Sequence, residues 1–113
     1  MQATYIPTGY SLADRRLIAN EGHPAGVRVV YLRPGGTDDQ IGMLSGIPGG
    51  DGGGAATGER VVLLGQDLPV FRTRQTLVVT ALLGPPDDPC SHYAILASGL
   101  TLEDYRRLVE GIR

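Results

Sequence analysis

The sequence of 113 residues contains no lysine, no tryptophan and only one cysteine, Cys90. A single cysteine cannot form a disulfide within the chain, so the sequence does not reveal the redox compartment. All ten basic side chains are arginine, and 12 acidic side chains give the chain a formal net charge of −2. Because the sequence also lacks a basic stripe, we expect no nucleic acid as partner.

Long apolar runs are missing as well. The longest one, residues 77–83, has the length of a strand, whereas a membrane-spanning helix needs about 18 apolar residues or more. The amino terminus shows no signal-peptide pattern of basic, apolar and small residues. We therefore expect no membrane span in this chain, although a fragment cut from a longer protein would have lost an anchor outside it.

The composition favours one globular domain, which we place at residues 4–113. A hydrophobic content of 42% and a charged content of 19% exclude a disordered chain. Residues 45–58 differ from the rest because they include Pro48 and seven glycines and have almost nothing to bury. We expect a flexible loop there, since contacts would not recover its ordering entropy.

Short strand-like segments occupy most of the remaining chain. Residues 10–18 fit either a short helix or an irregular strand, and we favour the strand. Residues 27–32 and 40–44 are rich in apolar side chains and predict a hairpin across the proline and glycine turn at 34–39. Further strands are expected at residues 60–64, 70–72, 76–83 and 92–97, the first two on either side of a turn at 65–67.

The carboxyl-terminal residues carry the most specific structural signal. Thr101 followed by Asp104 is an acidic variant of the capping box, and Leu100 with Tyr105 fits a hydrophobic staple. Glu103 is correctly placed to pair with Arg107 on the polar side of the expected helix. Apolar residues recur at helical spacing, namely Leu102, Tyr105, Leu108, Val109 and Ile112.

These elements predict the α+β class. The expected architecture is a meander-like antiparallel sheet of six or seven strands, with one C-terminal amphipathic helix packed on one face.

Cys90 and His92 are the strongest candidates for catalysis. Two residues apart at the start of a strand, they project to the same side, where an imidazole could activate a thiolate. No third residue at a recognisable spacing would orient the imidazole, so we expect no catalytic residue and keep this pair as the alternative. The same pair with His23 or Asp87 could bind zinc, but the spacing matches no four-ligand pattern.

Two other motifs suggest ligands at first sight. Gly53 and Gly58 have the spacing of a phosphate-binding loop, but Glu59 and Arg60 stand where that loop has Lys and Ser or Thr. The pairs Asp38–Asp39 and Asp87–Asp88 could bind calcium or magnesium, yet aspartate is also favoured in exposed turns. We expect neither a cofactor nor a metal.

The aromatic and basic residues suggest structural roles. The five tyrosines and Phe71 are too scattered for a platform that stacks bases. Arg72 and Arg74 alternate along a predicted strand, where we expect a solvated sheet edge that discourages aggregation.

The order of several segments resembles a family of bacterial proteins. The segments are the Tyr-Ile-Pro-Thr-Gly-Tyr opening at residues 5–10, the strands at 27–31, 61–65 and 77–81, and the run from Tyr93 to Leu100 that leads into residues 101–104. This succession resembles a domain-of-unknown-function family found as the carboxy-terminal ectodomain of anti-sigma-factor-like membrane proteins and of some lipoproteins. Members often carry a Trp near the penultimate strand, whereas this chain has Thr80–Leu82 there.

The resemblance implies a location and a role rather than a catalytic site. It implies an extracytoplasmic module, normally anchored to a membrane, that senses or binds a protein, a peptide or a lipid. Our expectation is therefore a non-enzymatic binding or sensory domain that buries its partner against the open sheet face or an edge strand. The alternatives are a small enzyme that uses Cys90 and His92, and a cytoplasmic module that binds a small molecule.

Overall fold

The computed structural model describes residues 2–20, 23–35, 39–45, 54–82, 84–85, 87 and 91–113. These residues form seven strands and one helix. The strands are β1 (Ser11–Asn20), β2 (His23–Leu32), β3 (Gln40–Ser45), β4 (Ala55–Leu63), β5 (Gln66–Thr73), β6 (Thr76–Leu82) and β7 (His92–Ser98), and the helix is α1 (Leu102–Glu110).

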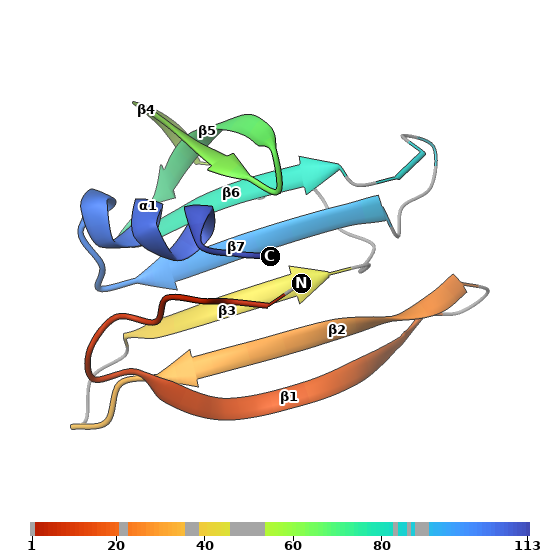
Figure 1. The fold of residues 1–113 in the computed structure, drawn as a ribbon, viewed down its shortest axis with the longest axis horizontal. Helices are drawn as coiled ribbons and strands as arrows, with labels where there is room; N and C mark the ends of the chain where they lie inside the picture. Colours follow the sequence, from red (N-terminus) through yellow and green to blue (C-terminus); the bar gives the residue numbers. More distant parts are fainter. Residues whose placement is uncertain are drawn as a thin grey trace.

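All seven strands belong to one antiparallel sheet with the order β1-β2-β3-β7-β6-β5-β4 (Figure 1). Strands β1 to β3 form one meander, and β4 to β7 form a second one that runs back across the sheet. The two meanders join where β3 pairs with β7. Strand β7 thus lies at the centre, which suits a strand with apolar side chains on both faces.

The predicted α+β class is wrong. The described residues are 60% strand and 11% helical, so this part of the chain is mainly β with one short C-terminal helix. The expected simple meander also fails at one connection, because β4 does not pair with β3 but lies at the opposite edge of the sheet. The antiparallel sheet itself was predicted correctly, as was a helix at the carboxyl end.

Most of the local predictions are confirmed. The ambiguous residues 10–18 fall largely in strand β1, and the predicted hairpin forms between β2 and β3, with Val29 opposite Met43. The expected loop at 45–58 falls mainly on residues 46–53, which lie outside the described residues. Its two ends are strand, because Ser45 closes β3 and residues 55–58 begin β4.

Helix α1 begins as the sequence predicts. The Thr101 hydroxyl accepts a hydrogen bond from the Asp104 backbone N–H at 3.2 Å, which satisfies one of the free amides of the first turn. On the exposed side, an Arg107 guanidinium nitrogen lies 3.0 Å from Glu103 Oε1. The apolar side of the helix faces the sheet, where Tyr105, Leu108 and Val109 are fully buried.

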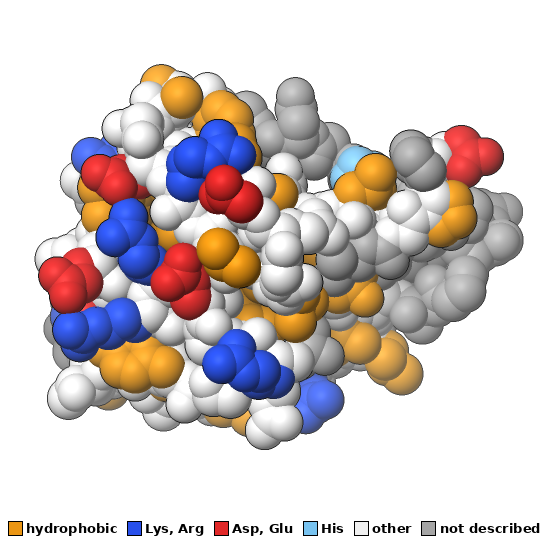
Figure 2. All heavy atoms as spheres, turned by 45° about the horizontal axis from the view of Figure 1, so that its top comes forward, with side chains coloured by type: hydrophobic (Ala, Val, Ile, Leu, Met, Phe, Trp, Pro, Cys, Tyr) orange, Lys and Arg blue, Asp and Glu red, His pale blue; other side chains and the backbone are white. Residues whose placement is uncertain are grey.

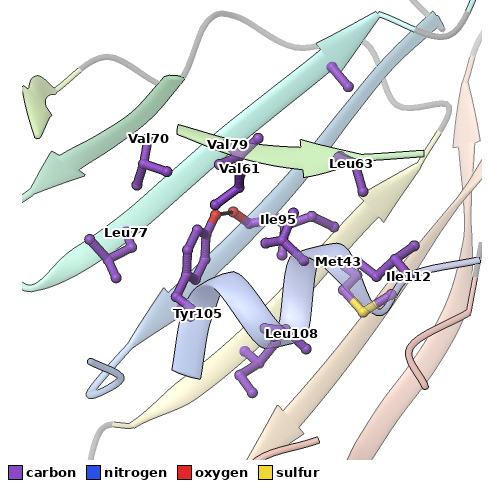
Figure 3. Close-up of a cluster of buried hydrophobic side chains, with 14 of the residues drawn as sticks. Met43, Val61, Leu63, Val70, Leu77, Val79, Ile95, Tyr105, Leu108 and Ile112 are labelled. Carbon is purple, nitrogen blue, oxygen red and sulfur yellow. Dashed lines mark hydrogen bonds between the residues drawn. The ribbon is translucent and has the colours of Figure 1, made fainter. Parts of the chain in front are cut away.

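The hydrophobic core lies between α1 and one face of the sheet, which we call the front face (Figure 3). Tyr105 is at its centre, and its hydroxyl donates a hydrogen bond to the Ile95 carbonyl at 2.6 Å. Residues from five strands surround the helix side chains: Ile41, Met43, Val61, Leu63, Val70, Leu77, Val79, Ala81, Ile95 and Ala97. Burial of each large apolar side chain contributes about 1.5 to 3 kcal/mol before entropy is subtracted.

The amino-terminal segment extends the cover on the front face. Ala3 forms an isolated antiparallel bridge with Ile112, and the backbones of Gln2 and Arg113 exchange two hydrogen bonds of 2.8 and 2.9 Å. The two ends of the chain therefore lie side by side above β3 and β7 (Figure 1). This pairing fixes both termini to the same side of the sheet as α1.

The edge strand β4 is also tied to α1. The Val62 backbone N–H donates to Glu110 Oε2 at 3.0 Å, and Arg106 pairs with Glu59 at 2.8 Å. Basic and acidic side chains lie next to one another on this side of the molecule (Figure 2). One of the two sheet edges is thus occupied by contacts within the chain.

Tyr105 predicts a dependence of stability on alkaline pH. Burial raises the pKa of its hydroxyl far above the ordinary value, and a backbone hydrogen bond with Val79 opposes this only in part. Above about pH 10 the unfolded chain ionises this tyrosine while the folded chain does not, so the free energy of unfolding falls as pH rises. We expect Tyr105→Phe to flatten this decline and to cost about 1 to 3 kcal/mol at neutral pH, because the Ile95 carbonyl loses a buried partner.

Urea unfolding at a series of pH values measures both effects. Tyr31→Phe is the matched control, since Tyr31 is only partly buried and its hydroxyl makes no hydrogen bond within the described residues. The account of the core is contradicted if the alkaline decline of Tyr105→Phe equals that of the unmodified protein.

Candidate functional site

The face of the sheet opposite α1 is the candidate functional site, and we call it the open face. Helix α1 and the amino-terminal segment both lie on the front face (Figure 1). Neither of them covers the open face, on which Val30 and Val78 are buried and Leu44, Phe71 and Leu96 are partly buried. Because side chains alternate along a strand, half of the residues in each strand point to this side.

The register of the strands aligns an apolar row across the open face. Val30 of β2 lies opposite Gly42 of β3, and Gly42 lies opposite Leu96 of β7. The row continues through Val78 of β6 to Phe71 of β5. Five consecutive strands thus contribute one position each, and the only position without a side chain is in β3.

Gly42 opens a groove in this row. A Cβ atom built at Gly42 would have no atom within 4 Å, so the space above its backbone is empty. Glycine inside a strand often marks a site where a ligand approaches the backbone closely. The groove has a volume of about 430 Å³ and is lined by Arg28, Val30, Gln40, Gly42, Leu44, Thr76, Leu96, Ala97 and Ser98. We call it the open-face groove.

The polar residues of the groove stand on two sides of the apolar row. Gln40, Thr76 and Ser98 lie on one side, and Thr76 and Ser98 are directly opposite each other in β6 and β7. On the other side, Arg28 lies opposite Leu44. The site therefore combines an apolar floor with hydroxyl and amide groups at one margin and a guanidinium group at the other.

A second hollow of about 440 Å³ lies on the front face, between the amino-terminal segment and strands β1 to β3. Its walls include Gln2, Arg15 and Tyr31. The apolar side chains nearest the outer edge are strongly exposed, with Leu12 at 56% and Leu17 at 73%. The lining of this hollow is more polar than apolar, whereas that of the open-face groove is mostly apolar, so we regard the open-face groove as the better-formed site for an apolar ligand.

The catalytic alternative cannot be built from the described residues. Cys90 lies outside them, and His92 is the first residue of β7, partly buried and opposite Leu82. Among the other zinc candidates, Asp87 is exposed in a turn and His23 begins β2. Within the described part of the chain, no group of three or more His, Cys, Asp or Glu side chains could hold a metal ion.

The remaining sequence motifs take structural positions. Asp39 forms an ion pair with Arg33, whereas Asp38 and Asp88 lie outside the described residues. Gly53 is also outside them, and the segment after Gly58 is a strand, as expected, rather than the helix of a phosphate-binding loop. Glu59 and Arg60 are both engaged, with Arg106 and Asp67 respectively.

The expectation for Arg72 and Arg74 is wrong. Strand β5 is not an edge strand, because it lies between β4 and β6, and Arg72 has Ala55 on one side and Leu77 on the other. Arg74 is in the turn between β5 and β6. Neither residue lies in the open-face groove.

No family model, curated protein or solved structure matches this chain. The resemblance to the bacterial ectodomain family therefore stays an expectation from the sequence. Among the described residues, no helix is both long enough and apolar enough to span a membrane. The function must be argued from the geometry of the open face itself.

Sequence reasoning did not identify Arg28, Gly42 or Leu96 as site residues. One local signal was available, because Gly42 interrupts an apolar strand that is otherwise well filled. The apolar row around Gly42 forms only because β3 pairs with β7, and these strands are far apart in the sequence.

Cys90 provides a direct check on the enzymatic alternative. If the chain has no thiolate nucleophile, we expect Cys90 to react with iodoacetamide as an ordinary thiol, with a half-maximal rate near about pH 8.5. His92→Ala should leave this profile unchanged. A midpoint near or below neutral pH that moves upward in His92→Ala would support the enzyme instead.

Proposed function

We propose that this protein is a non-enzymatic binding or sensory domain that receives an apolar ligand in the open-face groove. The observation that supports this most strongly is the empty space above Gly42 in the middle of an apolar row. Leu96 of the row and Leu44 beside it are partly exposed, so a ligand in the groove would remove part of their apolar surface from water.

The groove is a better candidate for the binding surface than the sheet edges. Edge strand β1 carries Asp14, Arg15 and Arg16 in its middle, and charged side chains on an edge oppose the addition of another strand. The other edge, β4, contacts α1 through Val62 and Glu110. These features favour the face over the edge as the place where a partner is bound.

The size of the groove favours a small ligand. A volume of about 430 Å³ lies within the range of roughly 300 to 1,000 Å³ that is typical of small-molecule sites. Of the partners that the resemblance implies, a lipid-like molecule suits this volume better than a folded protein does. The groove spans strands β2, β3, β7 and β6, and it includes Val30, Gly42 and Leu96 of the apolar row.

The chemistry of the groove favours binding over catalysis. The described residues that line it include no carboxylate, imidazole or thiol. Its polar groups are a guanidinium, an amide and hydroxyls, which hold a ligand in place but are poor general bases.

A location outside the cytoplasm and a membrane tether are part of this proposal, and they are supported by the sequence resemblance alone. Reading the gene upstream of the codon for Tyr5 tests them. We expect a membrane-spanning segment or a lipoprotein signal there, and an upstream cytoplasmic domain without either would contradict this part of the proposal.

Gly42→Val tests the groove. A Cβ at this position meets no neighbour, so the valine should fit the strand and raise the free energy of unfolding by about 0.5 to 1 kcal/mol. The same side chain fills the groove, and we expect binding of decyl amphiphiles to weaken at least tenfold. Isothermal titration calorimetry below the micelle concentration measures this affinity.

Ala55→Val is the matched control, because Ala55 is an exposed strand residue that does not line the groove. It should bind as the unmodified protein does. The proposal is wrong if Gly42→Val folds and binds normally, or if the unmodified protein binds no decyl amphiphile of any charge.

A further inference from the structure

The charge at one margin of the open-face groove points to the kind of ligand that it binds. Arg28 lines the groove, is exposed, and makes no hydrogen bond or ion pair with any described residue. Asp39, next to the groove residue Gln40, forms an ion pair with Arg33, so these two charges cancel. Arg28 is therefore the unbalanced charge among the described residues that line the groove.

The residue beside Arg28 on the open face makes an arginine at this position destabilising for the ligand-free fold. Arg28 lies directly opposite Arg16 of β1, and like charges opposite each other on a sheet are destabilising. Asp14 offsets one of the two charges, because its carboxylate lies 2.8 Å from Arg16 Nε. The three residues keep a net positive charge, which an incoming anion would neutralise.

The apolar row provides a site for the rest of such a ligand. Leu44 lies opposite Arg28 in β3, and the empty space above Gly42 lies two residues further back along the same strand. From β2 to β6 the groove crosses three strand spacings, which is about 14 Å at roughly 4.8 Å for each spacing. An extended alkyl chain of medium length fits this distance.

We propose that the ligand is a single-chain carboxylate amphiphile, bound with its carboxylate on Arg28 and its chain across Gly42. This inference depends on the proposed function, because it names the ligand class of the same groove. Guanidinium and carboxylate groups form two parallel hydrogen bonds, which fixes the position of the headgroup. The chain lies between Val30 and Leu96 and reaches towards Thr76.

Three ligands with the same chain and different headgroups test the charge. Decanoate, decyl glucoside and decyltrimethylammonium are titrated by calorimetry below their micelle concentrations. We expect the unmodified protein to bind decanoate about tenfold more tightly than the neutral glucoside and to bind the cation most weakly. The preference for decanoate should shrink as the salt concentration rises, since the guanidinium is exposed.

Arg28→Glu should reverse this order, so that decyltrimethylammonium binds most tightly. Arg28→Gln should bind all three ligands with similar affinity. Arg15→Glu is the matched control, because it makes the same change of net charge on the front face of the neighbouring strand and should preserve the preference for decanoate. Arg28→Glu also replaces a like-charge pair with Arg16 by an opposite pair, so we expect its thermal unfolding temperature not to fall.

The outcomes separate this inference from the proposed function. If all three ligands bind equally, and Arg28→Glu changes nothing while Gly42→Val abolishes binding, the groove is the site but the carboxylate assignment is wrong. If decanoate binds to Gly42→Val as well as to the unmodified protein, or if no decyl ligand binds, both proposals are wrong. Both proposals are supported if Arg28→Glu reverses the order of ligand affinities and Gly42→Val loses binding.

Discussion

The structure depends on the packing of one short helix against one face of a seven-stranded sheet. Helix α1 has nine residues, and its apolar side, centred on Tyr105, meets residues from β3 to β7 on the front face. The amino-terminal segment adds cover by pairing with the residues that follow the helix. Together, α1 and the amino-terminal segment cover the front face only. The open face is therefore not covered by either of them.

The charged residues follow the same division. Around α1 and β4, opposite charges are paired, as in Arg106 with Glu59 and Arg107 with Glu103. Such exposed pairs contribute about 0 to 1 kcal/mol each, but they leave little net charge on that side. Arg28 on the open face has no such partner within the described residues. The two faces differ in cover, and together with the groove at Gly42 this is why we assign binding to the open face.

Local features of the fold could be predicted from the sequence, and non-local ones could not. The cap at Thr101 and the hairpin between β2 and β3 depend on residues close together in the chain, and both are confirmed. The pairing of β3 with β7 depends on segments separated by three other strands, and no local pattern encodes it. The open-face groove depends on that pairing, because Gly42 and Leu96 share a row only once β3 and β7 are adjacent. The sequence indicated Cys90 and His92 instead, because two residues so close together in the chain can be recognised without knowing the fold.

The central claim is that the open face, and not the front face, is the surface that receives a ligand. Nuclear Overhauser effects between the chain protons of bound decanoate and the methyl groups of the protein test it most directly. The account predicts contacts to Val30, Leu44 and Leu96 and none to the front-face residues Leu12 and Leu17. Contacts to Leu12 and Leu17, without contacts to Leu44 and Leu96, would contradict it.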